Sequence, residues 1–173
     1  MSAIFERRSV RQFLPKPVEN EKIERVLRAG FEAPSAHNRR PWEFLVLTAR
    51  ADLDAIAGMS PYARMCTAAA AAIAPCVNLE TGGGAKPDDT WWVQDLAAAT
   101  ENILLQITEE GLGGVWLGWY PDQGRVREFS ARFGLPGHIV PFSVIALGYP
   151  EKTPQKRDRY DPAKVHYGAY GKR

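Results

Sequence analysis

The stretch from Trp91 to Glu110 predicts a long helix that is apolar on almost every side. Bulky aliphatic residues recur at helical spacing on one face, and alanine and leucine fill much of the rest. Gly111 follows it as a suitable C-terminal cap. A helix of this kind needs neighbours around most of its circumference, so we expect it to be central and buried. Its expected core residues are Leu96, Ala97, Ala98, Ala99, Ile103, Leu104, Leu105 and Ile107.

Short apolar strands and amphipathic helices alternate around this central helix. Residues 18–33 repeat apolar side chains at helical spacing, with Asn20 as the expected N-cap and Pro34 forcing the end. Asp122 is expected to cap a later helix that Gly134 closes. The pattern also predicts strands at 42–48, 68–77, 115–120 (broken by Gly118) and 139–147, weaker helical segments at 51–57 and 62–65, and a loop at 81–89. This order indicates an α+β fold.

Composition fits one globular domain over residues 1–173, because 45% of the residues are hydrophobic and 24% are charged. Lysine and arginine number 22 against 20 acidic residues, so the net charge of +2 gives no general case for binding nucleic acid. The most apolar run, 68–77, is too short to cross a bilayer, and no apolar segment follows the basic N-terminus as in a signal peptide. We therefore expect a cytoplasmic protein that acts without a membrane or nucleic acid.

No side chain stands out as a catalyst or metal ligand. Cys66 and Cys76 are too few and too far apart for a metal or redox motif, and we expect both to be small buried hydrophobic residues. His37, His138 and His166 are scattered, which argues against a metal site. The chain also lacks a GxSxG motif, a Cys–His signature and an evident carboxylate pair. Hydrolysis and covalent catalysis therefore lack the residues to perform them.

Positive charge gathers near both ends of the chain. Guanidinium groups beside a hydroxyl can bind a phosphate through several hydrogen bonds at once. Two such clusters are able to meet around a single anion, although charge alone favours ordinary solvated termini. The clusters are Arg7, Arg8, Ser9 and Arg11 at one end and Lys156, Arg157 and Arg159 at the other.

Two further segments are suited to a flat ring. The turn 33–42 is rich in small residues, and Ser35 and Asn38 can read the polar edge of a ring, although Asn38 can equally serve a local turn. The glycine-rich segment 111–120 follows a helix and lacks GxGxxG, which disfavours a Rossmann phosphate loop. Gly118 within a strand is typical of a close approach by a backbone or ligand. An anion clamp and a ring cradle together indicate a cofactor that carries its own chemistry.

Taken together, these segments resemble the nitroreductase family of FMN flavoproteins, specifically its short members. The landmarks occur in order over almost the whole chain, and the ordered set is specific although each is weak alone. They are Arg7-Arg8-Ser9-Val10-Arg11, Ala33-Pro34-Ser35-Ala36-x-Asn38-x-x-Pro41-Trp42, Trp92-Val93-Gln94-Asp95, Ala98-Ala99-Thr100-Glu101-Asn102, Gly111 to Gly118, Ile139-Val140-Pro141-Phe142, Ala146 to Pro150, Arg159-Tyr160-Asp161-Pro162 and Val165-His166-Tyr167.

The resemblance implies an α+β fold with a central mixed, mostly antiparallel sheet flanked by helices, in an intertwined homodimer. It implies two FMN sites at the subunit interface and a C-terminal arm, residues 151–173, that packs on the partner. The aromatic residues of this arm, Tyr167 and Tyr170, also suggest contact with a partner because they are poor residues to leave in water.

The resemblance also assigns cofactor-binding residues. Arg7, Arg8, Ser9 and Arg11 would hold the FMN phosphate, joined by Arg159 and with less support by Arg157. Pro34, Ser35, Ala36 and Asn38 would border the flavin from the other subunit. Leu117 and Gly118 would lie at the ring, with the Gly118 N–H near N5, and Arg64 would stabilise the anionic reduced flavin.

The activity implied is electron transfer from NAD(P)H through flavin N5 to nitro compounds, quinones or similar flat small molecules, with no catalytic side chain. Another flavin chemistry on the same fold, such as reductive dehalogenation or flavin processing, is the first alternative. A flavin-binding protein without turnover is the second, and a nucleic-acid binder using the N-terminal arginines comes last.

One departure from the family pattern generates a prediction. The family commonly has Asn-x-Gln-Pro-Trp, whereas Arg39 and Arg40 precede Pro41-Trp42 here. The charge of Arg40 is expected to favour an anionic acceptor or the 2′-phosphate of NADPH. Replacing Arg40→Gln should then lower turnover with NADPH relative to NADH, and steady-state rates with the two donors measure this. An unchanged preference would contradict the assignment.

Overall fold

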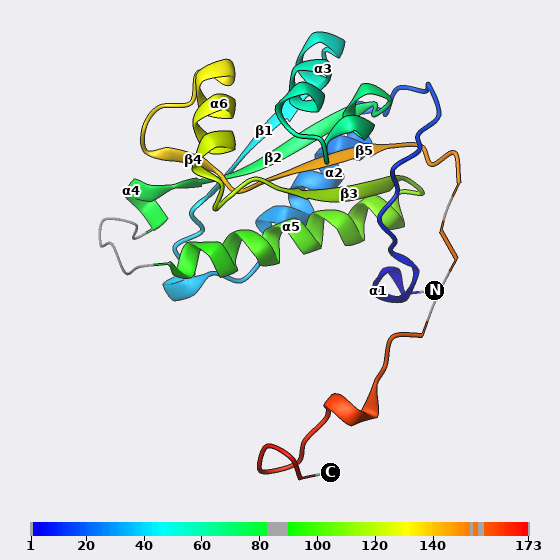
Figure 1. Cartoon of the computed structure of the whole chain (residues 1–173), viewed down its shortest axis with the longest axis vertical. Coiled ribbons are helices and arrows are strands. Elements are labelled where there is room, and N and C mark those ends of the chain that lie inside the picture. The colour runs from blue at the N-terminus through cyan, green and yellow to red at the C-terminus, as the bar shows by residue number, and fades with distance from the viewer. Residues whose placement is uncertain (1, 83–89, 153, 156–157, 173) are drawn as a thin grey trace.

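A five-stranded antiparallel sheet forms the middle layer of the computed structural model, which describes residues 2–82, 90–152, 154–155 and 158–172 (Figure 1). Strands β1 (Trp42–Leu47), β2 (Ala71–Asn78), β5 (Ser143–Gly148) and β3 (Gly113–Gly118) lie side by side in that order. The short strand β4 (Ile139–Pro141) pairs with the far end of β2. Strands β2 and β5 lie inside the sheet, which explains why both are continuous apolar runs.

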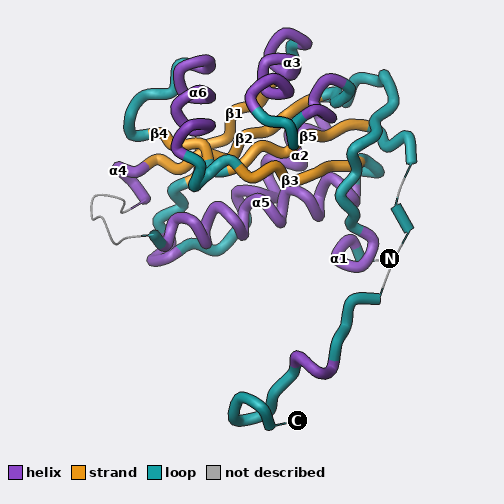
Figure 2. The backbone as a smooth tube through the Cα atoms, viewed as in Figure 1, coloured by secondary structure: helices purple, strands orange, loops and turns teal. Residues whose placement is uncertain are grey.

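Helices cover both faces of this sheet, as the layers in Figure 2 show. Helices α2 (Asn20–Phe31) and α5 (Trp91–Glu109) lie on one face, and α3 (Arg50–Met59) and α6 (Gln123–Phe133) lie on the other. Each face of the sheet has its own apolar core, and alternate residues of β2 pack into one core and the other. Ala71 and Ile73 pack with α2 and α5, whereas Ala72 and Ala74 pack with α3 and α6. This period of two is what the pleat of a strand requires.

Most of the expected elements are confirmed, with shifts at their ends. Helix α2 begins at Asn20 itself, so Glu19 occupies the N-cap position and the expected Asn20 cap is wrong. The expected final strand is two strands, because its register against β2 shifts by one residue at Phe142: Pro141 pairs with Cys76, whereas Ile145 pairs with Ile73. Gly118 ends β3 and does not interrupt it. The helical segment expected at 62–65 is a 3₁₀ helix at Arg64–Thr67.

Helix caps behave as their chemistry predicts. The Asp122 carboxylate accepts hydrogen bonds from Gly124 N and Arg125 N, which confirms it as the N-cap of α6. Gly134 closes the same helix with a left-handed φ of 66°. Gly111 follows α5 with a φ of 71°, a conformation that glycine adopts without steric cost. The short helices α1 (Ala3–Glu6) and α4 (Leu79–Gly82) complete the set, and most of the loop expected at 81–89 lies outside the described residues.

Within one chain, only the side of helix α5 that faces the sheet is buried. Leu96, Ile103 and Ile107 are fully buried, but Trp91 is 54% exposed and Leu105 is partly exposed. Figure 1 shows α5 along one side of the molecule, with α1 near its C-terminal end and the end of the chain extending away from the body. The expectation that this helix is buried is therefore confirmed for the side facing the sheet and wrong for its outer face within one chain. None of the described helices is long and apolar enough to span a membrane.

Two helical glycines provide a matched test of this packing. A Cβ on Gly30 of α2 would lie 2.9 Å from Phe44 Cζ and 3.0 Å from Ile103 Cδ1, whereas a Cβ on Gly58 of α3 would meet nothing within 4 Å. We expect Gly30→Ala to lower the free energy of unfolding by about 1 to 3 kcal/mol, since the interface is already full. Gly58→Ala should raise it by roughly 0.5 to 1 kcal/mol through helix propensity alone. Urea unfolding measures both, and equal effects would refute the close packing at Gly30.

Candidate cofactor site

The two ends of the chain meet at the edge of the sheet. Ser9 forms a parallel bridge with Gly114, and Val10 N donates to Gly114 O at 3.0 Å. This approach depends on Gly113, because a Cβ there would lie 2.7 Å from Val10 Cβ. A glycine in β3 therefore does allow a close approach, as expected for this segment, but the close contact is at Gly113 and not at Gly118.

The same N-terminal segment also holds the start of the C-terminal arm. Phe13 bridges Pro150 in antiparallel fashion, and Glu151 N donates to Gln12 O at 3.0 Å. The guanidinium of Arg8 donates through Nε to Gln155 O at 3.3 Å. The chain ends are thus linked by backbone pairing, and their charges are brought together as a consequence.

A basic cavity of about 520 Å³ lies where these ends meet. It contains four of the six residues expected to hold a phosphate, since Arg7 lies elsewhere and Arg157 lies outside the described residues. Arg7 Nε lies 2.9 Å from Glu101 Oε1 on α5, and this ion pair directs it to the helix. The residues that line the basic cavity are Arg8, Ser9, Arg11, Pro154, Gln155 and Arg159.

A second cavity, of about 510 Å³, adjoins β3 and has largely apolar and aromatic walls. Arg11 lines this ring cavity as well as the basic cavity, so the two share one guanidinium. Gly118 is exposed, and the position of a Cβ on it is open space, which leaves its backbone accessible. The described residues that line the ring cavity are Arg11, Ser60, Pro61, Tyr62, Met65, Trp116, Leu117, Gly118, Trp119 and Arg125.

The tryptophans of this wall are mainly structural. Trp119 is 1% exposed, and its Nε1 donates to Arg125 O at 3.0 Å. Trp116 packs edge-on against Phe142 with 5.8 Å between the ring centres. Leu117 is 7% exposed and belongs to the core as well as to the cavity wall. These contacts show that both tryptophans serve packing first.

Arg64 is exposed at the start of its 3₁₀ helix and is not among the residues that line the ring cavity, although its neighbour Met65 is. Arg125 also lines this cavity, although no motif in the sequence indicates it. The Asp122 cap does place Arg125 in the first turn of α6, but its direction toward the cavity depends on the contact with Gly118 O.

The turn between α2 and β1 has an unusual backbone conformation and is hydrogen-bonded to α5. Ala36 N donates to Asp95 Oδ1 at 2.9 Å, which ties the turn to α5. His37, Asn38 and Arg40 all have left-handed φ values, of 54°, 54° and 51°. Non-glycine residues rarely adopt this conformation without a structural or functional reason.

Two hydrogen bonds inside this turn orient its polar groups. Arg40 N donates to Ser35 Oγ at 2.9 Å, and Arg40 Nε donates to Asn38 Oδ1 at 2.9 Å. A guanidinium can only donate hydrogen bonds. The amide oxygen of Asn38 must therefore face Arg40, and its NH₂ group must face elsewhere. The alternative of a locally bonded Asn38 is thus partly correct.

Neither cavity receives a residue from this turn within one chain. Among the described lining residues, none comes from Pro34, Ser35, Ala36 or Asn38. The turn lies beside the first half of α5, on the side of the sheet that carries α2. One subunit by itself therefore does not bring together all the residues assigned to a flavin.

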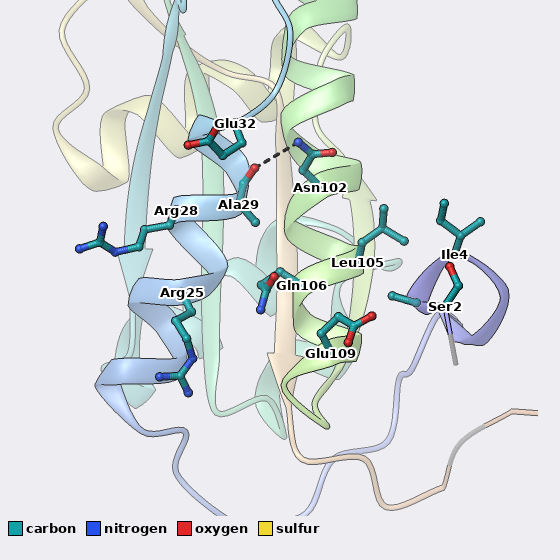
Figure 3. Close-up of a pocket in the computed structure, with 11 residues that line it drawn as sticks. Ser2, Ile4, Arg25, Arg28, Ala29, Glu32, Asn102, Leu105, Gln106 and Glu109 are labelled. Carbon is teal, nitrogen blue, oxygen red and sulfur yellow. Dashed lines mark hydrogen bonds between the residues drawn. The ribbon is translucent and has the colours of Figure 1, made fainter.

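A larger groove of about 610 Å³ lies on the other side of the molecule, between α1, α2 and α5 (Figure 3). Its floor is formed by helix side chains such as Leu105 and by Asn102, whose Nδ2 donates to Ala29 O at 3.1 Å. Two of its charged groups are already paired, because Arg25 donates twice to the Glu110 carboxylate and Arg28 pairs with Glu24. This groove offers surface for contact and no evident chemistry.

The described residues also provide no cysteine nucleophile or metal centre. Burial raises the pKa of the Cys66 and Cys76 thiols to about 12, so both stay protonated near neutral pH. Within the described ranges, no group of three or more His, Cys, Asp or Glu side chains is placed to hold a metal ion. The site that remains is a basic cavity beside a partly aromatic one, and the two share Arg11.

Comparison with known proteins assigns this arrangement to a family. A protein of Methanothermobacter thermautotrophicus, named as a candidate NADH dehydrogenase/NAD(P)H nitroreductase, is 41% identical over 96% of this chain and 85% of its own. The crystal structure of a candidate NADH oxidase from Clostridium acetobutylicum superimposes with a TM-score of 0.91 and 41% identity, covering 98% of this chain and all of that one (100%).

A second crystal structure, of a candidate NADH dehydrogenase/NAD(P)H nitroreductase from Bacteroides thetaiotaomicron, has a TM-score of 0.90 and 43% identity over 97% of this chain and 96% of its own. The family model described as "Nitroreductase family" matches residues 4–149, which span the sheet, its covering helices and the N-terminal arginines. The chain is therefore a member of the nitroreductase family of oxidoreductases.

Proposed function

We propose that the protein binds FMN without a covalent bond and transfers electrons from NADH or NADPH to flat small molecules such as nitro compounds or quinones. One observation carries the proposal: the basic cavity and the ring cavity share Arg11. FMN has a phosphate at one end and a flat ring at the other, and this pair of cavities offers cations for the first and an open backbone for the second.

The residues present fit the phosphate. Arg8, Arg11 and Arg159 surround the basic cavity with guanidinium groups, and Ser9 adds a hydroxyl. Arginine forks match phosphate oxygens better than lysine does, which gives both charge and orientation. Arg7 would support the site from its ion pair with Glu101, and Arg157 stays a prediction.

The ring end also fits. The open space over Gly118 lets a flat molecule approach the backbone, and Leu117 and Trp116 supply an apolar wall that excludes water. When bound there, FMN supplies the two-electron carrier that the protein's own side chains lack. The protein's task is to bind, orient and tune the ring, and this chemistry does not require a catalytic side chain.

We further propose that the active form is a homodimer, with residues 151–173 acting as an arm on the partner. The outer face of α5 supports this, because Trp91 is 54% exposed and Leu105 adjoins the groove of Figure 3. The arm itself supports it as well, since Tyr160, Tyr167 and Tyr170 are 71%, 66% and 95% exposed. Light scattering should give the mass of two chains, and a monomer that still binds FMN would refute the arrangement.

In such a dimer, Pro34, Ser35, Ala36 and Asn38 would reach the flavin from the second subunit. The rigid turn that holds them is consistent with a role in binding, because left-handed residues cluster where geometry has to be fixed. A crystal structure of a candidate nitroreductase from Desulfovibrio desulfuricans in complex with FMN, 26% identical with a TM-score of 0.80, supports the cofactor assignment. The buried free cysteines suit the reducing cytoplasm, which we propose as its location.

Anaerobic reduction tests the proposed function directly. The protein saturated with FMN should be yellow and should lose its visible absorbance when NADH or NADPH is added, then regain it with a quinone or nitroaromatic compound. A flavin that stays oxidised with both donors would indicate a binding protein without turnover. Failure to bind FMN would refute the proposal as a whole.

Comparison of FMN with riboflavin tests the phosphate end. Replacing Arg8→Gln should weaken FMN binding about ten- to a hundredfold, the usual worth of a charge-assisted hydrogen bond. Riboflavin, which lacks the phosphate, should bind both forms equally. Arg127→Gln, at an exposed position of α6, serves as the matched control and should change neither affinity. Equal losses for FMN and riboflavin would contradict the assignment of Arg8.

A further inference from the structure

Arg125 reaches the ring cavity from the first turn of α6. Its side chain is 29% exposed and lines the cavity beside Gly118. Arg127, two positions further along the same helix, is exposed and lies outside the residues described for this cavity. The same residue type thus occurs once inside the site and once outside it on a single helix.

Several contacts fix the direction of the Arg125 side chain. Its Nη1 donates to Gly118 O at 3.2 Å, and its Nε lies 3.2 Å from Asp122 Oδ2. Its backbone carbonyl accepts the indole N–H of Trp119, which is almost completely buried. The guanidinium therefore spans from the cap of α6 to the last residue of β3, and it holds the carbonyl of a glycine that has no side chain to restrain it.

The charge of the ring cavity is unbalanced. Its described lining contains two guanidinium groups, Arg11 and Arg125, and no carboxylate. Asp122 pairs with Arg125 but is not part of that lining, so the positive partner faces the cavity. Arg11 is shared with the basic cavity, where a phosphate would neutralise it. Arg125 is then the cation left for the ring.

We propose that Arg125 is a positioning residue of the flavin site that fixes the Gly118 backbone, and that its charge makes the bound ring easier to reduce. The inference rests on the proposed binding of FMN. A hydride from NADH or NADPH brings two electrons and one proton to a neutral ring, so the ring gains one negative charge while the nicotinamide is oxidised. A fixed cation in a partly desolvated site stabilises that charge.

The reduction potential of bound FMN, measured by equilibration with a reference dye, tests this without turnover. Arg125→Gln keeps a donor for Gly118 O but removes the charge. We expect the ratio of the dissociation constants of reduced and oxidised FMN to rise about tenfold, which lowers the potential by about 30 mV for a two-electron couple. Affinity for oxidised FMN should change less than about threefold. Arg125→Lys should restore most of the potential, and Arg127→Gln should match the original protein.

A second variant changes the potential in the opposite direction and does not depend on the first one folding. Asp122→Asn keeps a good N-cap for α6 but removes the negative partner of Arg125. It should raise the potential, whereas a purely structural role for the Asp122–Arg125 pair predicts no shift. Unchanged potentials in both Arg125→Gln and Asp122→Asn would overturn the inference. If the original protein binds no FMN, the proposed function fails instead, so the two failures are distinguishable.

Discussion

The close contact between Val10 and the backbone of Gly113 is the interaction on which the site depends. Without a Cβ at position 113, the N-terminal segment can pair with β3 and continue along the sheet edge to Pro150. That pairing brings Arg8 and Arg11, on either side of Ser9 and Val10, close to the start of β3 and into the basic cavity. The arginines of the basic cavity are on irregular segments that the buried sheet holds in place, whereas Leu117 and Gly118 of the ring cavity are on β3 itself.

Apolar side chains and charged side chains occupy different parts of the molecule: the first fill the cores on the two faces of the sheet, and the second lie at its edge. The apolar cores on each face need only the alternation of β2 and β5, which a strand provides by its pleat. The charged residues gather outside these cores, where the guanidinium groups remain partly hydrated. The protein thus places several like charges together without burying them, and an anion can supply the missing countercharge.

Much of this arrangement could be predicted from sequence, but only where a local pattern determines it. The apolar runs of β2 and β5 and the Asp122 and Gly134 caps of α6 follow from their own residues. The break at Phe142 could not be predicted, because it is a one-residue change of register against β2, in which Cys76 pairs with Pro141 but Ile73 pairs with Ile145. The ordered motifs predicted Arg8, Arg11 and Arg159 at the basic cavity, but they also assigned Arg7, which pairs with Glu101 instead. The direction of Arg125 depends on its contact with Gly118 O, which no local pattern of residues indicates.

The turn between α2 and β1 has a further consequence for how two chains would associate. Its left-handed residues each cost on the order of 1 kcal/mol, and the bonds to Ser35, Asn38 and Asp95 hold them in place within a single chain. That cost is met during folding of the monomer, so little conformational entropy is left to lose at the turn when another surface meets it. Such a preformed edge acts as a rigid template, and the shape of the complementary surface has to follow it.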